Sequence, residues 1–308
     1  MSIQEFKGRR VRLTYGVIIL LFGTVIGTMQ SGLANVTVGG VGDVGEAVYP
    51  AEAYFHRTDP VTWSTNTLGF VGAFDSVGQG ASTLLVDNVG SENSVTCGML
   101  CVAYAGGTVG DVTVSGSGAR VWAGTTYIGY GGMAQFSVSD GASVVAGQTF
   151  FGYKIVGILN VSGADSLFSA TRVTVGWPEE AQGGIGTVNI RDGGLVKTAE
   201  INLYSSSFIR FDSGGKLALA CDASVDTMSE FVDQIGGDGL GEIGFWSGDS
   251  YLSYTNFTEG VDYAVYRGTG DLDGYAVLAE GIPEPSSVAL ICTFAMGLGL
   301  RLLLRRRY

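Results

Sequence analysis

Short segments in which apolar residues alternate with mostly polar ones recur along the middle of the chain. Alternation with a period of two is typical of β-strands and places the apolar residues of a segment on one face. The third residues of successive copies are on average 25 positions apart, and a small turn containing glycine usually follows. The six copies are residues 84–87, 112–115, 136–139, 159–162, 188–191 and 209–212.

A second pattern, an apolar residue followed by a small one, lies between these copies at similar spacing. Two strands per repeat are typical of the rung of a parallel β-solenoid, whose rungs bury their apolar faces only when they stack. We therefore predict an all-β fold with a parallel β-solenoid of about six rungs over residues 62–219. The alternative, a β-sandwich, would pair its strands mainly antiparallel and would need no recurring period. The second pattern comprises Val71 and Gly72, Val102 and Ala103, Ile128 and Gly129, Phe151 and Gly152, and Val175 and Gly176.

Residues 35–61 and 220–282 interrupt the repeat and are predicted to cap the solenoid, because an open rung exposes unpaired backbone groups. The first segment contains Pro50, His56 and Pro60. The second is richer in aromatic residues, and its pattern predicts a short helix over 228–235 and strands over 251–257, 263–266 and 275–278. A separate binding module is the alternative interpretation of residues 220–282.

The composition fits a folded, strand-rich chain with few helices. Of 308 residues, 50 are Gly and only 5 are Pro, which excludes collagen, and 46% are hydrophobic, which excludes a disordered chain. Residues 35–282 carry 9 basic and 27 acidic side chains, a net charge of −18. Binding to phosphate backbones needs a clustered basic face, so we expect no nucleic acid among the partners.

Residues 1–34 have the features of a secretory signal peptide. A basic stretch over 7–12 precedes an apolar run over 15–26, and the small residues Gly32 and Ala34 are spaced for cleavage after Ala34. We expect this segment to form a signal helix and the chain to be exported. The alternative is an N-terminal anchor that is not cleaved.

Residues 283–308 combine a short motif, an apolar run and a basic end in that order. The run over 286–304 has 19 residues, about 28 Å as a helix, which is close to the thickness of the bilayer hydrocarbon. We predict a transmembrane helix whose basic end lies in the cytoplasm, so that the acidic middle lies outside. The flanking motifs are Pro283, Glu284 and Pro285 before the run and Arg305, Arg306 and Arg307 after it.

This arrangement resembles the PEP-CTERM sorting signal of exported bacterial proteins. The resemblance implies recognition by an exosortase-type membrane protease, anchoring in the inner membrane before processing, and delivery to the cell surface or to extracellular polysaccharide. An ordinary C-terminal membrane anchor is the alternative. The repeats over residues 62–219 are in turn similar to the β-helical repeats of autotransporter passengers and of many exported PEP-CTERM proteins.

Candidate catalytic residues are few. The single histidine, His56, lies in a predicted cap, and we expect no catalytic site, no metal site and no cofactor. Acids at the turns of a β-helix can bind calcium beside a basic residue in polysaccharide lyases, which leaves a lyase or glycoside hydrolase as the alternative function. Tight turns, however, favour Asp next to Gly for local reasons. The residues concerned are Asp140, Asp165, Asp192 and Asp212, with Arg172, Arg191 and Arg210 as candidate bases.

An aromatic residue follows the small residue of the second pattern in four successive repeats: Tyr104, Tyr130, Tyr153 and Trp177. In a solenoid these four residues would form a vertical stack. An exposed stack would suit sugar rings, which pack their C–H faces on aromatic rings. The residues two positions earlier are all apolar, which favours a ladder that points into the core.

Three cysteines, Cys97, Cys101 and Cys221, lie in the exported part, and their pairing is left open. Taken together, these features lead us to expect an exported, non-enzymatic structural or adhesion-type protein of the cell surface or extracellular matrix, in contact with extracellular polysaccharide.

Overall fold

The computed structural model describes residues 35–40, 44–48, 67–72, 82–87, 94–178, 183–221, 225–239 and 241–281. All of them belong to one compact unit, Ala34–Tyr308. The predicted signal helix, His56 and the predicted sorting signal lie outside the described residues. Among the helices that are described, none is long and apolar enough to cross a membrane.

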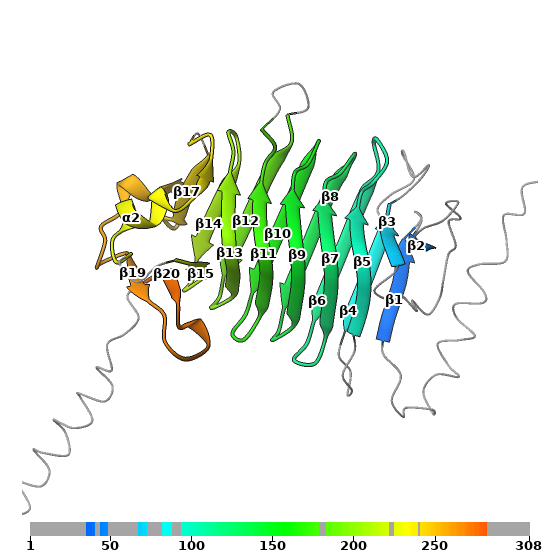
Figure 1. Cartoon of the computed structure of the whole chain (residues 1–308), viewed down its shortest axis with the longest axis horizontal. Coiled ribbons are helices and arrows are strands. Elements are labelled where there is room, and N and C mark those ends of the chain that lie inside the picture. The colour runs from blue at the N-terminus through cyan, green and yellow to red at the C-terminus, as the bar shows by residue number, and fades with distance from the viewer. Residues whose placement is uncertain are drawn as a thin grey trace, which may run out of the picture. The chain divides into compact units, whose positions relative to one another are not determined.

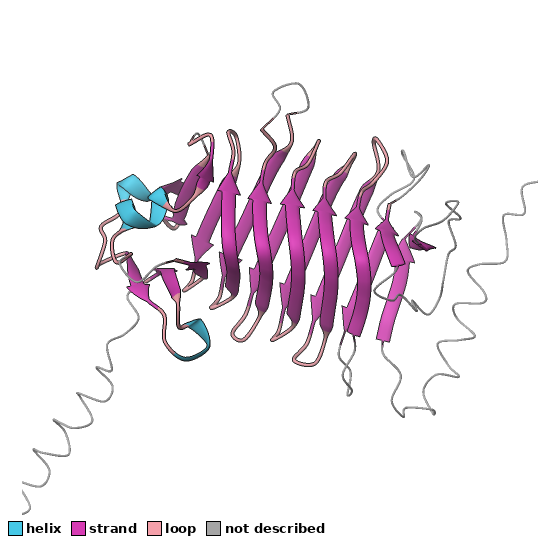
Figure 2. Ribbon diagram, viewed as in Figure 1, coloured by secondary structure: helices cyan, strands magenta, loops and turns pink. Residues whose placement is uncertain are grey.

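Two sheets of mostly parallel strands form the body of this unit, one layer behind the other (Figures 1 and 2). The first, sheet A, consists in spatial order of β1 (Asn35–Gly40), β4 (Ser82–Asp87), β6 (Val109–Ser115), β8 (Met133–Ser139), β10 (Val156–Ser162), β12 (Ile185–Arg191), β14 (Phe208–Asp212), β17 (Glu242–Trp246) and β18 (Tyr251–Ser253). The chain alternates between the sheets, so that a strand of sheet A and the next strand of sheet B make one turn of a parallel β-solenoid.

Sheet B contains the longer strand of most turns. Its order is β19 (Tyr263–Arg267), β20 (Tyr275–Glu280), β15 (Lys216–Ala220), β13 (Leu195–Leu203), β11 (Leu167–Val175), β9 (Ser143–Phe151), β7 (Arg120–Ile128), β5 (Ser94–Val102), β3 (Thr67–Val71) and β2 (Val44–Val48). The short β16 (Gly236–Gly237) pairs with β13. The solenoid is therefore confirmed, with about five turns rather than six. Antiparallel strands cover its first and last parallel strands.

The register of the strands follows the sequence repeats. In sheet A the third residues of all six copies lie side by side, in the order Val86, Val114, Val138, Val161, Ile190 and Phe211. In sheet B the apolar residues of the second pattern, from Val71 to Val175, are also paired in register. A 25-residue repeat therefore corresponds to one turn of the backbone.

The core lies between the sheets and consists of columns of like residues. Phe136, Leu159 and Ile190 have no exposed surface, and neither do Phe151 and Phe168. Each turn buries its inward side chains against the turns on either side, which is the main source of stability for a repeat that has no core of its own.

Glycine is required where sheet B ends and the chain turns. Gly152 has a φ of +70°, and a Cβ placed on it would lie 2.3 Å from the carbonyl carbon and oxygen of Ile185. Gly129 has a φ of +78° at the same position of the preceding turn. Ala103 occupies the equivalent position one turn earlier with a φ of 55°. The excess of glycine thus partly reflects corners at which the backbone of one turn touches the next.

Antiparallel strands lie at both ends of the solenoid. At the N-terminal end β1 pairs with β4, and β2 pairs with β3. At the C-terminal end β20 pairs with β15 and with β19, and β18 pairs with β17. Helix α2 (Met228–Asp233) falls within the predicted range, and its capping box joins Thr227 and Glu230.

One expected strand at the C-terminal end is shorter than its aromatic pattern predicted. Strand β18 ends at Ser253, and residues Tyr254–Asn256 form a 3-10 helix. The Thr255 hydroxyl donates to Ser253 Oγ at 3.2 Å, and the Asn256 amide donates to the carbonyl oxygen of Ser253 at 3.1 Å. Such local bonds compete with strand pairing. A second 3-10 helix, Gly270–Leu272, lies between β19 and β20.

The three described cysteines are not in disulfide bonds. Burial raises the pKa of Cys97 to about 12, and burial together with the neighbouring Cys97 raises the pKa of Cys101 to about 12. Both thiols therefore stay protonated at neutral pH and act as small apolar side chains in β5.

Candidate binding surface at the aromatic corner

The four repeated aromatic residues lie where sheet B ends, directly after the left-handed corner of each turn. Tyr130 and Tyr153 follow Gly129 and Gly152, whose φ angles are +78° and +70°. Because these corners recur once per turn, the rings fall above one another along the solenoid. Tyr104 and Trp177 extend the same column by one turn at each end.

The rings of this column are in contact throughout. Tyr104 stacks on Tyr130 with ring centroids 4.9 Å apart and an angle of 17° between the ring planes. Tyr130 stacks on Tyr153 at 5.0 Å and 9°. Trp177 lies 4.3 Å from Tyr153 but is tilted by 52°. The vertical stack expected from the spacing is therefore present.

The expected inward orientation of the stack is wrong. All four side chains are half-buried, and none belongs to the core between the sheets. Strand parity predicts the direction of a side chain only while the backbone stays extended. The left-handed residue that precedes each aromatic residue interrupts the strand, so the ring turns to the outside of the corner.

A second column of outward-facing residues lies beside the first and was not anticipated. Tyr127 stacks on Phe150 at 4.9 Å and 11°. Tyr127 also meets Tyr130 and Tyr153 edge to face, at 5.4 and 5.3 Å. The signal in the sequence was the outward position of these two residues in β7 and β9, one residue before the buried Ile128 and Phe151. We call Tyr104, Tyr127, Tyr130, Phe150, Tyr153 and Trp177 the aromatic corner.

The stacking determines which parts of the rings a ligand can reach. Rings that stack with an offset cover one another's faces. The tyrosines inside the column therefore present ring edges and hydroxyl groups, once per turn at about 4.8 Å. A ligand that lies along the corner meets a row of hydrogen-bonding groups on an apolar base.

A positive charge lies on the same surface. The Lys154 ammonium is 4.9 Å from the centre of the Tyr130 ring and 5.9 Å from that of Tyr153, within the range of cation–π attraction. Burial, assisted by the neighbouring Cys101, raises the pKa of Tyr127, whose phenol is therefore protonated at neutral pH. The corner thus combines hydroxyl donors with one cation.

The acids considered for catalysis have structural roles at the turns. Asp140 and Asp192 have φ angles of 56° and 53°, and each precedes a glycine with positive φ. The Asp140 carboxylate accepts hydrogen bonds from the hydroxyls of Ser115 and Ser139, at 2.9 and 3.0 Å. These are the backbone and side-chain features of tight turns.

The other two acids also lie at turns. Asp165 has a φ of 65°, and the Asp212 carboxylate accepts a hydrogen bond from Ser213 Oγ at 2.8 Å. Among the residues that the structure describes, no three or more His, Cys, Asp or Glu side chains are grouped so that they could hold a metal ion.

The candidate basic residues lie in two places, since Arg172 is in sheet B, whereas Arg191 and Arg210 lie on paired strands of sheet A and both act on the phenol of Tyr251. Arg172 lies on β11 in sheet B, where its guanidinium binds Glu200 Oε2 at 2.7 Å. Arg191 and Arg210 lie on β12 and β14 in sheet A. Arg191 Nε is 3.9 Å from a carboxylate oxygen of Asp192. The residues of the sorting motif lie outside the described part of the chain.

Comparisons with protein-family models, with curated proteins and with solved structures gave no match to this chain.

Proposed function

We propose that this chain is an exported, non-enzymatic structural or adhesion-type protein that contacts extracellular polysaccharide through its aromatic corner. The observation that carries the proposal is the regular stack of half-buried tyrosine rings along the solenoid, with Lys154 beside it. A polysaccharide repeats its hydroxyl groups along one axis, and the corner repeats its own along the solenoid axis. Matching repeats allow many weak contacts to add.

The proposed route to the surface rests on the two ends of the sequence. Pro283, Glu284 and Pro285, the apolar segment 286–304 and the arginine cluster would be recognised by an exosortase-type protease while the chain is anchored in the inner membrane. Mass spectrometry of the mature protein tests this. We expect a C-terminus near residue 285 in a wild-type strain and an intact tail in a strain that lacks exosortase. An intact C-terminus in the cytosol would contradict export.

The lyase alternative receives less support. It needs clustered turn acids with a free basic residue nearby. Asp140 is held by two serine hydroxyls and Arg172 by Glu200, and Arg210, which forms no ion pair among the described residues, lies against aromatic rings. These side chains already have local partners, which supports a structural role.

A double variant, Tyr130→Ser with Tyr153→Ser, tests the binding role of the aromatic corner. We expect retention on polysaccharide isolated from the producing cells to fall at least about tenfold, because two adjacent rings contribute to each contact. Stability should fall by only about 1 to 3 kcal/mol, since the rings are half-buried and outside the core. The full-length chain in detergent is used for the co-sedimentation and melting measurements.

Trp122→Ser is the matched control. Trp122 is an aromatic residue of β7 on the same face, 44% exposed and outside the aromatic corner. It should leave retention unchanged. Equal retention by the double variant and the wild type would refute the proposed contact, and equal loss in both variants would show that the corner is not the specific site.

A further inference from the structure

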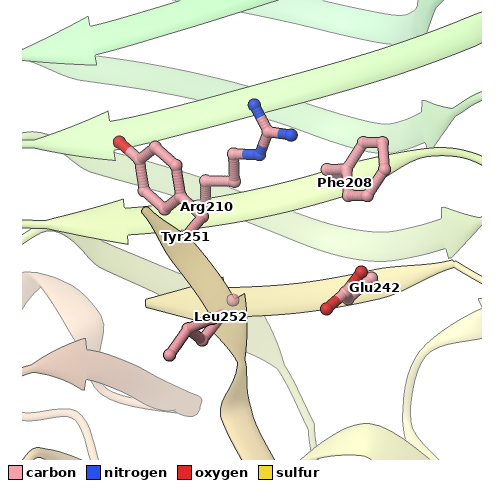
Figure 3. Close-up of a pocket in the computed structure, with 6 residues that line it drawn as sticks. Phe208, Arg210, Glu242, Tyr251 and Leu252 are labelled. Atoms are coloured by element: carbon pink, nitrogen blue, oxygen red, sulfur yellow. The ribbon is translucent and has the colours of Figure 1, made fainter. Parts of the chain in front are cut away.

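A small hollow lies on the outer side of sheet A, where the solenoid meets the C-terminal strands (Figure 3). It is lined by Phe208, Arg210, Glu242, Gly244, Tyr251 and Leu252. These residues come from the neighbouring strands β14, β17 and β18, so the hollow exists only where the last turn and the C-terminal strands come together. Its empty volume is about 230 Å³, part of it open to solvent.

The hollow exists because a glycine lies next to a long side chain. Gly244 is the partner of Arg210 in the register of β14 and β17. A Cβ at Gly244 would lie 2.8 Å from the carbonyl oxygen of Leu252, so the close approach of β18 requires glycine there. The position beside Arg210 is therefore left without a side chain.

Arg210 is held by aromatic rings instead of by an acid. The central carbon of its guanidinium is 4.6 Å from the centre of the Phe208 ring and 5.1 Å from that of Tyr251. Its Nε is buried and has no hydrogen-bond acceptor, and within the described part of the chain Arg210 forms no ion pair. The rest of the guanidinium is partly exposed, and its planar N–H groups favour an anion that can accept two hydrogen bonds.

Two further groups shape the hollow. Glu242 lies beside Phe208 in the register and brings a carboxylate to the far side from Tyr251, as Figure 3 shows. Burial raises the pKa of Tyr251, with a smaller contribution from Asp212, so that its phenol is a neutral donor. An anion would therefore bind on the Arg210 and Tyr251 side, and hydroxyl groups of the same ligand would point toward Glu242.

We propose that this hollow binds one acidic sugar residue, with the sugar carboxylate on Arg210. Arginine donates to a carboxylate through two parallel N–H groups, and the adjacent rings provide an apolar surface for the sugar ring. The Glu242 carboxylate accepts hydrogen bonds from sugar hydroxyls and repels a second negative charge.

The choice of a sugar as the occupant rests on the proposed function, whereas the anion site follows from Arg210 and its surroundings. The two sites are separable, because the aromatic corner lies at the end of sheet B and the hollow lies on sheet A. Variants of one site should leave the other intact.

The test measures binding of a glucuronate tetrasaccharide to the full-length chain by isothermal titration calorimetry, with a glucose tetrasaccharide and inorganic phosphate for comparison. We expect the glucuronate oligomer to bind at least about tenfold more tightly than either. Arg210→Gln should weaken it at least about tenfold, because the charge and the bidentate contact are both lost. Glu242→Gln should bind it several-fold more tightly, because a repelling charge is removed.

Arg172→Gln is the matched control. Arg172 Nε is likewise buried without an acceptor, but its guanidinium already pairs with Glu200, so its loss should leave binding unchanged. Arg210→Lys keeps the charge but loses the planar fork of donors, so it should bind the glucuronate oligomer at least about threefold more weakly than the wild type. This variant keeps the test valid if Arg210→Gln does not fold.

Three results would overturn the inference: wild-type affinity in a folded Arg210→Gln protein, equal affinity for the glucose tetrasaccharide, or phosphate binding as tight as that of the sugar acid. The two proposals can fail separately. If retention on native polysaccharide depends on Tyr130 and Tyr153 but glucuronate does not bind, only the proposed sugar site at the hollow is refuted. If the protein neither is retained on native polysaccharide nor binds glucuronate, the proposed function is refuted as well.

Discussion

The solenoid and the segment that follows it are stabilised in different ways. In the solenoid the same kind of residue recurs at the same place in every turn, as in the buried column that contains Val114, Val138 and Val161. This column continues into the following segment only as far as Phe245 of β17, which pairs with Phe211 and lies 5.2 Å from its ring. Beyond β17 the contacts are no longer between equivalent residues of successive turns: Phe245 stacks on Tyr263 at 4.9 Å, and the helix of this segment has its own capping box.

This difference determines where a substitution is tolerated. In the solenoid each position is in contact with its equivalents above and below, so a change of backbone or volume disturbs three turns. After the solenoid a residue has no equivalents in neighbouring turns, so we expect the effect of a change to stay local. The same contrast explains why the aromatic corner repeats along the turns, whereas the Arg210 hollow occurs where the repeat ends.

The largest difference is expected from alanine at two glycines with nearly equal φ. Gly152, at a corner of the solenoid, has a φ of +70°, and Gly274, before β20, has a φ of +82°. A Cβ at Gly152 would collide with the backbone of Ile185, while a Cβ at Gly274 meets nothing within 4 Å. We expect Gly152→Ala to cost about 3 kcal/mol or more and Gly274→Ala about 1 kcal/mol.

Chemical denaturation of both variants measures this difference. Equal losses would mean that left-handed strain alone sets the cost and that contact between turns adds nothing. The comparison between the solenoid and the following segment would then be wrong at its main point.

The sequence predicted the solenoid because its signals repeat. Six weak copies of one pattern reinforce one another, and their alignment gave the register that β4 to β14 adopt. The alternating pattern does not show where the parallel stack ends: nothing in residues 84–87 indicates that β1 pairs with β4 antiparallel, and nothing in residues 209–212 indicates that β17 adds a further parallel strand. Strand β18 was predicted too long because its local hydrogen bonds leave no trace in the hydrophobic pattern.

The aromatic corner was half visible in the sequence. The spacing of the aromatic residues predicted the stack. The direction of the rings depends on the φ angles of Gly129 and Gly152, and strand alternation that is counted through a left-handed residue assigns the rings to the wrong side of the sheet. The hollow could not be predicted, because Arg210 and Gly244 are brought together by a pairing outside the repeat. Nothing in the sequence near either residue indicates the other.

Removal of the helix cap tests the local character of the C-terminal segment. Thr227→Ala deletes the side chain that accepts from the backbone N–H of Glu230, and we expect a loss of about 1 kcal/mol. Thr227→Ser should restore most of it, because a hydroxyl remains. Thr113→Ala, on the outer face of β6, is the control in the solenoid and should change stability by less than about 0.5 kcal/mol. Denaturation midpoints of the three variants decide the order, and a larger loss at Thr113 would contradict it.

The smallest expected effect is on the pH dependence of stability, which should have opposite signs for one carboxyl group in the solenoid and one at the C-terminal end. In the solenoid, the hydrogen bond from Arg172 is the main cause that lowers the pKa of Glu200, so ionisation stabilises the folded state. At the C-terminal end, burial raises the pKa of Glu280 and outweighs the hydrogen bond from the Gly214 N–H, so ionisation destabilises it. The two carboxyl groups should therefore respond oppositely to acid.

Glutamine variants reveal the two signs. The Glu200 contribution is present above the unfolded pKa near 4.5 and is lost as the pH falls through the lower folded value, so Glu200→Gln should lower stability at pH 7 and have little effect at pH 3. The pair is about half exposed, which limits the loss to about 0.5 kcal/mol.

For Glu280 the stabilising contribution is present below the unfolded pKa near 4.5 and is lost as the pH rises through the higher folded pKa. Glu280→Gln should therefore raise stability at pH 7 relative to the wild type, because glutamine still accepts from Gly214 without a buried charge. Melting curves at the two pH values measure both effects, and changes of the same sign at pH 7 would show that the burial of Glu280 does not outweigh its hydrogen bond.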